Sequence, residues 1–156
     1  MSVRMLFPKN RLGELLRKPG GLKVSEAMEQ ANANLATLRG ACLDDLTAVV
    51  EDMEQRFTAF PGAFDDAAVT DFYTAAGRSV GVAGACGIGA VDAALTSLCV
   101  LLDNLRLRRQ WDAEAVQVHV KSLRVLVSLA KAGQDSGLDQ ILDGLTRVSA
   151  RYAVAS

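Results

Sequence analysis

The chain contains one histidine, His119, and imidazole is the side chain whose ordinary pKa lies nearest to neutrality. Any imidazole that acts as a general base or accepts a phosphoryl group must therefore be His119. No acidic residue lies four positions before or after it to orient the ring, and Lys121 and Ser122 follow it. Val120 and Leu123 beside it belong to an apolar helical stripe, so we expect His119 at the boundary of the core. Phosphotransfer through His119 is kept as an alternative.

Acidic residues occur as adjacent pairs, and two carboxylates in one cleft can divide the work of a general acid and a general base. The pairs are Asp44-Asp45, Glu51-Asp52 and Asp65-Asp66. Catalytic pairs need a shared cleft and perturbed surroundings, whereas these positions are typical of solvated helix faces and helix caps. The chain has no Gly-x-Ser-x-Gly sequence, and its one histidine leaves a catalytic triad a single possible base. We therefore expect a protein that is not an enzyme and has no catalytic residues.

The cysteines are widely spaced, at Cys42, Cys86 and Cys99, and no two are close enough to suggest a zinc or redox motif. We expect them to be small core residues, and we expect folding to need no disulfide, metal or cofactor. Seventeen basic and eighteen acidic side chains give a net charge of −1. This balance leaves no large positive field to collect phosphate backbones, so a nucleic-acid partner is not expected.

The first 22 residues carry scattered basic side chains and no apolar core of signal-peptide length. A second stretch, Ser79–Leu102, is apolar, but Asp92 lies near its middle and glycine and alanine dominate it. We therefore expect a cytoplasmic protein with no membrane span and no membrane partner.

Glycine recurs in a largely helical stretch, at Gly77, Gly81, Gly84 and Gly87. Inside a helix each glycine costs about 1 kcal/mol relative to alanine, so a group of them needs a reason. One reason is the close approach of two backbones where helices meet, and we expect Gly84 and Gly87 to serve such packing. Nucleotide binding does not fit, because no predicted strand precedes the glycines and no Gly-Lys-Ser or Gly-Lys-Thr sequence is present to hold phosphates.

The same stretch resembles the histidine phosphotransfer (HPt) family, helical bundles that pass a phosphoryl group between receiver domains. The family motif is a histidine, then Lys-Gly three and four residues later, then Ala-Gly and a further glycine before the next helix. Gly81, Ala83-Gly84 and Gly87 stand in register with its small residues. Gly77 replaces the phosphoacceptor histidine and Val80 replaces the lysine. The resemblance therefore implies a pseudo-HPt domain that keeps the docking scaffold and cannot transfer a phosphoryl group at this position.

The same stretch, together with three further segments, also resembles the CheE group of alphaproteobacterial chemotaxis accessory proteins. The further segments are Pro8-Lys9-Asn10-Arg11-Leu12, Lys18-Pro19-Gly20-Gly21-Leu22 and Leu98–Asp103. The two resemblances imply a non-catalytic module of bacterial two-component, chemotaxis or phosphorelay signalling that binds a response-regulator receiver domain or a sensor histidine kinase. Arg78 would then be the cation nearest to the receiver's acidic pocket. The residues expected to bind the partner are Thr74, Gly77, Arg78, Ser79 and Gly81.

Apolar residues recur at spacings of three and four along nearly the whole chain, and no run alternates in the manner of a half-buried strand. We expect a short helix over residues 10–17, a break at Lys18–Gly21, and a long helix capped by Ser25. The later helices are expected from Asp65 or Asp66 through Ala76, over 88–105, from the cap Asp112 to a point before Gly133, and over 137–152.

These elements predict an all-α fold, an up-and-down four-helix bundle of HPt type with additional short helices at the termini. Residues 1–24 are expected to form an N-terminal extension and residues 25–156 the bundle domain. The long helix, at about 30 residues and roughly 50 Å, needs long neighbours or a partner subunit. The alternative function is therefore a structural homo-oligomer, such as a homodimer, in which long helices and the small-residue face pack against a second copy and no receiver binds.

Overall fold

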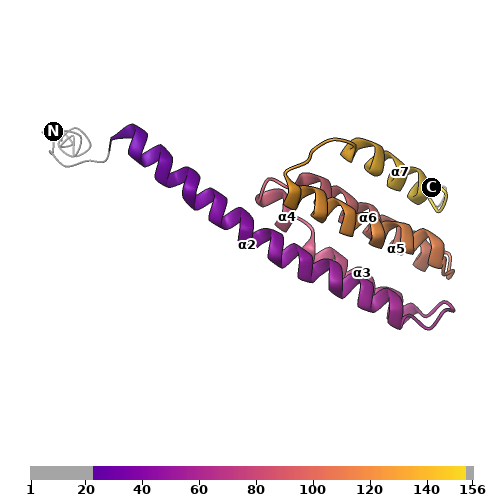
Figure 1. Cartoon of the computed structure of the whole chain (residues 1–156). Helices are drawn as coiled ribbons and strands as arrows, with labels where there is room; N and C mark the ends of the chain where they lie inside the picture. Colours follow the sequence, from indigo (N-terminus) through magenta and orange to yellow (C-terminus); the bar gives the residue numbers. More distant parts are fainter. Residues whose placement is uncertain (1–22, 154–156) are drawn as a thin grey trace, which may run out of the picture. The chain divides into compact units, whose positions relative to one another are not determined.

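The computed structural model describes residues 23–153, and every regular element among them is a helix (Figure 1). The all-α class predicted from the sequence is confirmed. The helices are α2 (Val24–Ala59), α3 (Asp66–Ser79), α4 (Val82–Ala85), α5 (Gly89–Leu107), α6 (Ala113–Ala132) and α7 (Leu138–Ala150). The short helix predicted over residues 10–17 and the break that follows it lie outside the described residues.

The described residues belong to two compact units, which meet in the sequence between Ala36 and Thr37, within α2. In the first unit every described residue is exposed. The second unit, from Thr37 onward, contains all the buried residues of the described chain. The domain boundary predicted between residues 24 and 25 stays a prediction.

The core of the second unit is organised around α5, which packs against α3, α4, α6 and α7. Seven residues of α5 are buried: Val91, Ala94, Leu95, Leu98, Leu101, Leu102 and Leu105. Helices α2, α3 and α6 contribute further buried apolar residues, among them Met53, Phe72 and Leu123, each at most 1% exposed. Short connections between these long helices favour a helical bundle, and that coarse architecture is what the structure has.

Helix ends carry the caps that the sequence predicts, with one exception. The Asp65 carboxylate accepts a hydrogen bond from the Ala68 backbone N–H at 2.8 Å, and Asp112 accepts one from Ala115 at 3.0 Å. Gly133 ends α6 with a left-handed φ of 65°. The predicted cap at Ser25 is wrong, because α2 begins at Val24 and Ser25 lies inside its first turn.

The cysteines lie in or against the core, as the sequence predicts: Cys42 is buried, and Cys86 and Cys99 pack against the core. The pairing of two of them was not predicted from the sequence. Cys42 of α2 and Cys86, just after α4, form a disulfide across 44 residues of sequence, with Cα atoms 6.5 Å apart. Cys99 remains a free thiol, and burial raises its pKa. Disulfides persist in oxidising compartments and are rare in the cytosol, so this bond does not support the expected cytoplasmic location.

Within residues 23–153, no helix combines the length and the apolar character that crossing a membrane requires.

Candidate docking site

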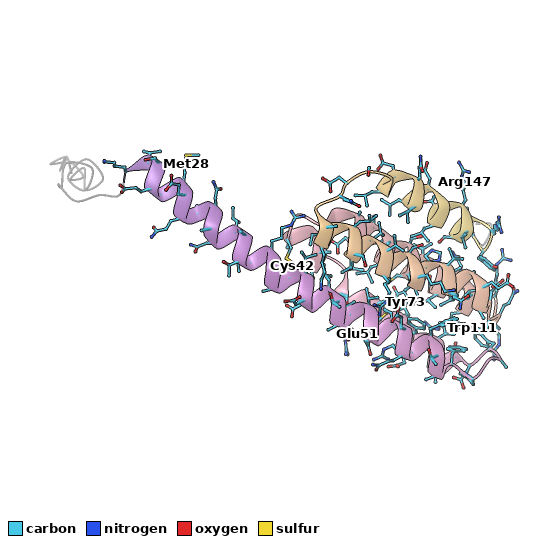
Figure 2. All side chains as sticks on the ribbon, viewed as in Figure 1. Met28, Cys42, Glu51, Tyr73, Trp111 and Arg147 are labelled. Carbon is cyan, nitrogen blue, oxygen red and sulfur yellow. A yellow bond between two sulfur atoms is a disulfide. The ribbon has the colours of Figure 1, made fainter. Side chains whose placement is uncertain are left out.

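The exposed side of α3 carries three of the five residues that the sequence predicts to bind a partner. Thr74, Gly77 and Arg78 are exposed, and their spacing of three and four places them on one helix face. Tyr73, labelled in Figure 2, lies beside them with 41% of its surface exposed, and Val80 follows at 39%. We call Tyr73, Thr74, Gly77, Arg78 and Val80 the α3 face.

The opposite side of α3 explains why this face points outward. Val69, Phe72 and Ala76 are at most 1% exposed and belong to the core that α3 shares with α5. Because α3 is amphipathic, burying these residues leaves Thr74, Gly77 and the side chain of Arg78 at the surface. The fold of the second unit therefore fixes the orientation of the α3 face.

Among residues 23–153, no contact accounts for the glycine at position 77 or pairs with the Arg78 guanidinium. Apart from Gly77, its two chain neighbours and the nearby backbone of α3, no heavy atom lies within 4 Å of the position that a Cβ would occupy on Gly77, and its φ lies outside the left-handed region. Within the described chain, no side chain or backbone oxygen accepts a hydrogen bond from the Arg78 guanidinium and no carboxylate pairs with it. A bare stretch of backbone and an unpaired cation therefore lie side by side at the surface.

The other two predicted residues, Ser79 and Gly81, have contacts inside the chain. Ser79 is half-buried, and its hydroxyl donates to the Ala75 backbone oxygen at 3.3 Å. Gly81 is exposed, but α3 has ended at Ser79, and the Gly81 N–H donates to Asp92 Oδ1 at 3.0 Å. The structure thus brings Thr74, Gly77 and Arg78 together and places Ser79 and Gly81 apart from them.

Asp92 organises the glycine-rich turn between α3 and α5. Its second carboxylate oxygen accepts the Gly84 N–H at 2.8 Å, and a Cβ on Gly84 would lie 2.5 Å from that oxygen. Gly84 is therefore a position of close approach. Gly87 was expected to pack closely as well, but its Cβ position is open, and its left-handed φ of 75° explains the glycine instead.

His119 is completely buried, at 0% exposure, so the boundary position expected for it is wrong. Its Nδ1 lies 2.9 Å from the Ala115 carbonyl oxygen, which only an N–H on Nδ1 can satisfy, so Nε2 is the acceptor. The Ser97 and Ser149 hydroxyls lie 3.0 and 3.1 Å from Nε2. Burial lowers the pKa of His119, which keeps the imidazole neutral.

The sequence could not reveal this burial, because α5 and α7 supply the serines that surround the ring. His119 lies on α6, and the distances in sequence to Ser97 and Ser149 are 22 and 30 residues. Helical periodicity predicts which face of its own helix a residue lies on, but it does not predict which neighbouring helix covers that face. No feature of the sequence near His119 indicates that Ser97 and Ser149 contact its ring.

A neutral imidazole beside a serine can activate a nucleophile, and Ser97 also lines a groove of about 380 Å³ between α5 and α7. Acyl transfer further requires N–H donors aimed at the developing oxyanion. Ser97 and Ser149 lie inside α5 and α7, where the backbone N–H groups are used in the helices' own hydrogen bonds. The cluster therefore fits a buried polar network that joins α5, α6 and α7.

The arginines at the C-terminal end of α5, Arg106, Arg108 and Arg109, bind within the chain. Arg106 pairs with Asp66 at 3.3 Å, and Arg108 donates to the Ala153 oxygen at 2.9 Å. The Arg109 guanidinium lies over the Phe64 ring, 5.6 Å from its centroid. These contacts distinguish the three arginines from the unpaired Arg78.

Comparison of the chain with protein-family models, with curated proteins and with solved structures gives no match. The similarities to the HPt family and to the CheE group therefore stay predictions that rest on the residues quoted above.

Proposed function

We propose that the protein is a non-catalytic signalling module of pseudo-HPt type, which binds a receiver domain or a sensor kinase through the α3 face. In this proposal α3, α5, α6 and α7 correspond to the four-helix bundle of the family. The role belongs to bacterial two-component or chemotaxis signalling, where the module would sequester, buffer or scaffold a response regulator.

The observation that carries the proposal is the exposure of Gly77 next to the unpaired Arg78. A receiver domain presents an acidic pocket around its phosphorylated aspartate, and a guanidinium forms strong charge-assisted hydrogen bonds to carboxylate and phosphate oxygens. Gly77 has no side chain, so a partner can approach the α3 backbone closely. The exposed apolar surface of Tyr73 and Val80 adds the kind of area that a protein interface buries.

A non-catalytic role is favoured because neither candidate phosphoacceptor position offers an accessible imidazole. Gly77 cannot carry a phosphoryl group, and His119 is 0% exposed with both ring nitrogens in hydrogen bonds. A phosphorylated receiver could reach Nε2 only if α7, which carries Ser149, moved away from His119. Docking without transfer is therefore the simplest activity for this surface.

Binding is tested by titrating purified receiver domains from the same organism, with and without a phosphoryl mimic, into the full-length protein. The titrations are run with the Cys42–Cys86 disulfide formed and reduced, because a cytoplasmic partner would meet the reduced form. We expect one receiver to bind with a micromolar Kd. Failure of every receiver to bind a folded protein in both states would exclude the proposal.

Two substitutions with matched controls locate the interface. Arg78→Glu should weaken binding by about 10- to 100-fold, because a charge-assisted contact is worth about 1.5–3 kcal/mol. Arg147→Glu on α7 changes the same charge at an exposed site without an ion pair in the described chain and should leave the Kd unchanged (Figure 2). Gly77→Leu should block close approach, whereas Gly144→Leu, at an exposed helical glycine of α7, should not. If each substitution on α3 weakened binding no more than its control on α7, the interface would lie elsewhere.

A further inference from the structure

The first part of α2 exposes large apolar side chains in a row. Val24, Met28, Leu35 and Leu38 are 77%, 61%, 63% and 64% exposed, and every residue from 23 to 41 is exposed. Figure 2 labels Met28 on this part of the helix. Helices in proteins owe most of their stability to packing of an apolar face, and contiguous exposed apolar surface marks an interaction site.

The spacing of these residues is that of a coiled coil. Val24, Met28, Ala31, Leu35 and Leu38 are separated by four, three, four and three residues. This alternation is a heptad repeat with Met28 and Leu35 at the a positions and Val24, Ala31 and Leu38 at the d positions. The stripe is therefore shaped for a second helix that lies along α2.

The residues that flank the stripe favour an identical helix as the partner. The e and g positions between Val24 and Leu38 are Ser25, Ala27, Asn32 and Asn34, none of which is charged. Glu26 and Glu29 fall at positions that point away from the seam. The e position directly after Leu38 is Arg39, which in a parallel pair faces the uncharged Asn34 of the second copy. Two copies can therefore pair without placing like charges opposite one another, and no charge within Val24–Leu38 flanks the seam to select a different, oppositely charged helix.

We propose that Val24–Leu38 pairs with the same segment of a second copy of this chain in a two-stranded coiled coil. The paired segment spans about 22 Å, or roughly two heptads, which is short for a coiled coil. The dimer should therefore be concentration-dependent, with a Kd in the micromolar range. This inference does not depend on the proposed function, and if both hold, the dimer carries two copies of the α3 face and can bind two receivers.

The test is the molar mass of the full-length protein, measured by sedimentation equilibrium from about 1 to about 200 µM, a range that brackets a micromolar Kd. We expect the mass to rise from 16.6 kDa towards twice that value as concentration increases. Leu35→Asp should raise the dimer Kd by at least tenfold, about 1.4 kcal/mol, because it puts two carboxylates into the seam. Val125→Asp, at a valine of α6 that is 47% exposed, should leave the dimer unchanged.

Circular dichroism of Leu35→Asp at low concentration checks that the core of the second unit still melts cooperatively, so loss of the dimer is not loss of the fold. A monomer at every concentration overturns the inference, since the stripe would then be covered by another part of the same chain or by a different partner. A dimer that Leu35→Asp does not weaken, or a larger assembly, also overturns it.

Discussion

Reducing the Cys42–Cys86 disulfide should remove a large part of the stability of the second unit. The bond closes a loop of 44 residues. In the chain-entropy description, closing a loop of that length lowers the entropy of the unfolded chain enough to stabilise the fold by about 4 kcal/mol. Single domains unfold with free energies of about 5–15 kcal/mol, so the reduced protein should be markedly easier to unfold.

Urea unfolding provides the assay, with Trp111 as the reporter. Trp111 is the only tryptophan and stacks on Phe60 with ring centroids 3.5 Å apart, so its fluorescence changes when that contact is lost. We expect the unfolding free energy to fall by about 4 kcal/mol in the presence of a reductant. The double variant Cys42→Ala/Cys86→Ala is the control, because the reductant should have no effect on its midpoint.

Thiol titration of the unfolded protein shows whether the Cys42–Cys86 disulfide is formed. The untreated chain should show one free thiol, that of Cys99, and the reduced chain three. An untreated protein with three thiols would refute the disulfide itself. A fully reduced protein with an unchanged urea midpoint would refute the entropic reasoning.

Three further predictions concern buried or closely packed groups. Burial lowers the pKa of His119 in the folded state. Near and below the unfolded pKa of about 6.5, the folded protein therefore binds fewer protons than the unfolded chain. The unfolding free energy should fall as the pH drops from about 7.5 to about 5.5, by at most about 1.4 kcal/mol per pH unit. His119→Gln, which leaves no histidine in the chain, should flatten this dependence in urea unfolding at each pH, and an identical slope in both proteins would contradict it. Gly84→Ala should lower the unfolding free energy by about 1–3 kcal/mol, because the new Cβ would push the Asp92 carboxylate away from the Gly81 and Gly84 N–H groups that it binds. Gly144→Ala, where the Cβ position is open, should be neutral or stabilising. Thermal melts that shift alike for the two variants would contradict the close contact. Incubation with a receiver that carries a radiolabelled phosphoryl group should leave no acid-labile phosphate on the chain. Phosphate that appears on the wild-type protein and not on His119→Gln would show instead that α7 opens and that the protein is a phosphotransferase.

The helices and their caps could be predicted from the sequence because their signals are local. Asp65 and Asp112 stand just before apolar periodic segments, and Gly133 stands just after one, so each helix end is encoded within a few residues. Ser25 was misplaced because the residues around it form helix whether or not a side chain caps the end. Boundaries of this kind shift by one or two residues without changing the fold.

The contacts between helices could not be predicted, because they join residues far apart in the sequence. Cys42 meets Cys86 only when α2 packs beside the turn after α4, and His119 is covered only when α7 brings Ser149 over it. Asp92 was recognisable as an acid in an apolar stretch, but its partners Gly81 and Gly84 depend on the path of the turn.

The α3 face could be predicted only in part, because some of its features are local in the sequence and others depend on the fold. Thr74, Gly77 and Arg78 share a face because they are three and four residues apart on one helix, which the sequence shows. Ser79 turns towards the core and Gly81 lies beyond the end of α3, and these two positions depend on where the helix stops. The sequence also did not show that Arg106, Arg108 and Arg109 have partners while Arg78 has none among residues 23–153.

Hydrogen exchange of the protein, alone and mixed with the receiver that binds it best, tests docking through the α3 face most directly. We expect the receiver to slow amide exchange over residues 73–82, at the end of α3 and in the turn that follows, and to leave α7 unaffected. Slowed exchange that is confined to other helices, or no change at saturating receiver, would contradict docking at Gly77 and Arg78.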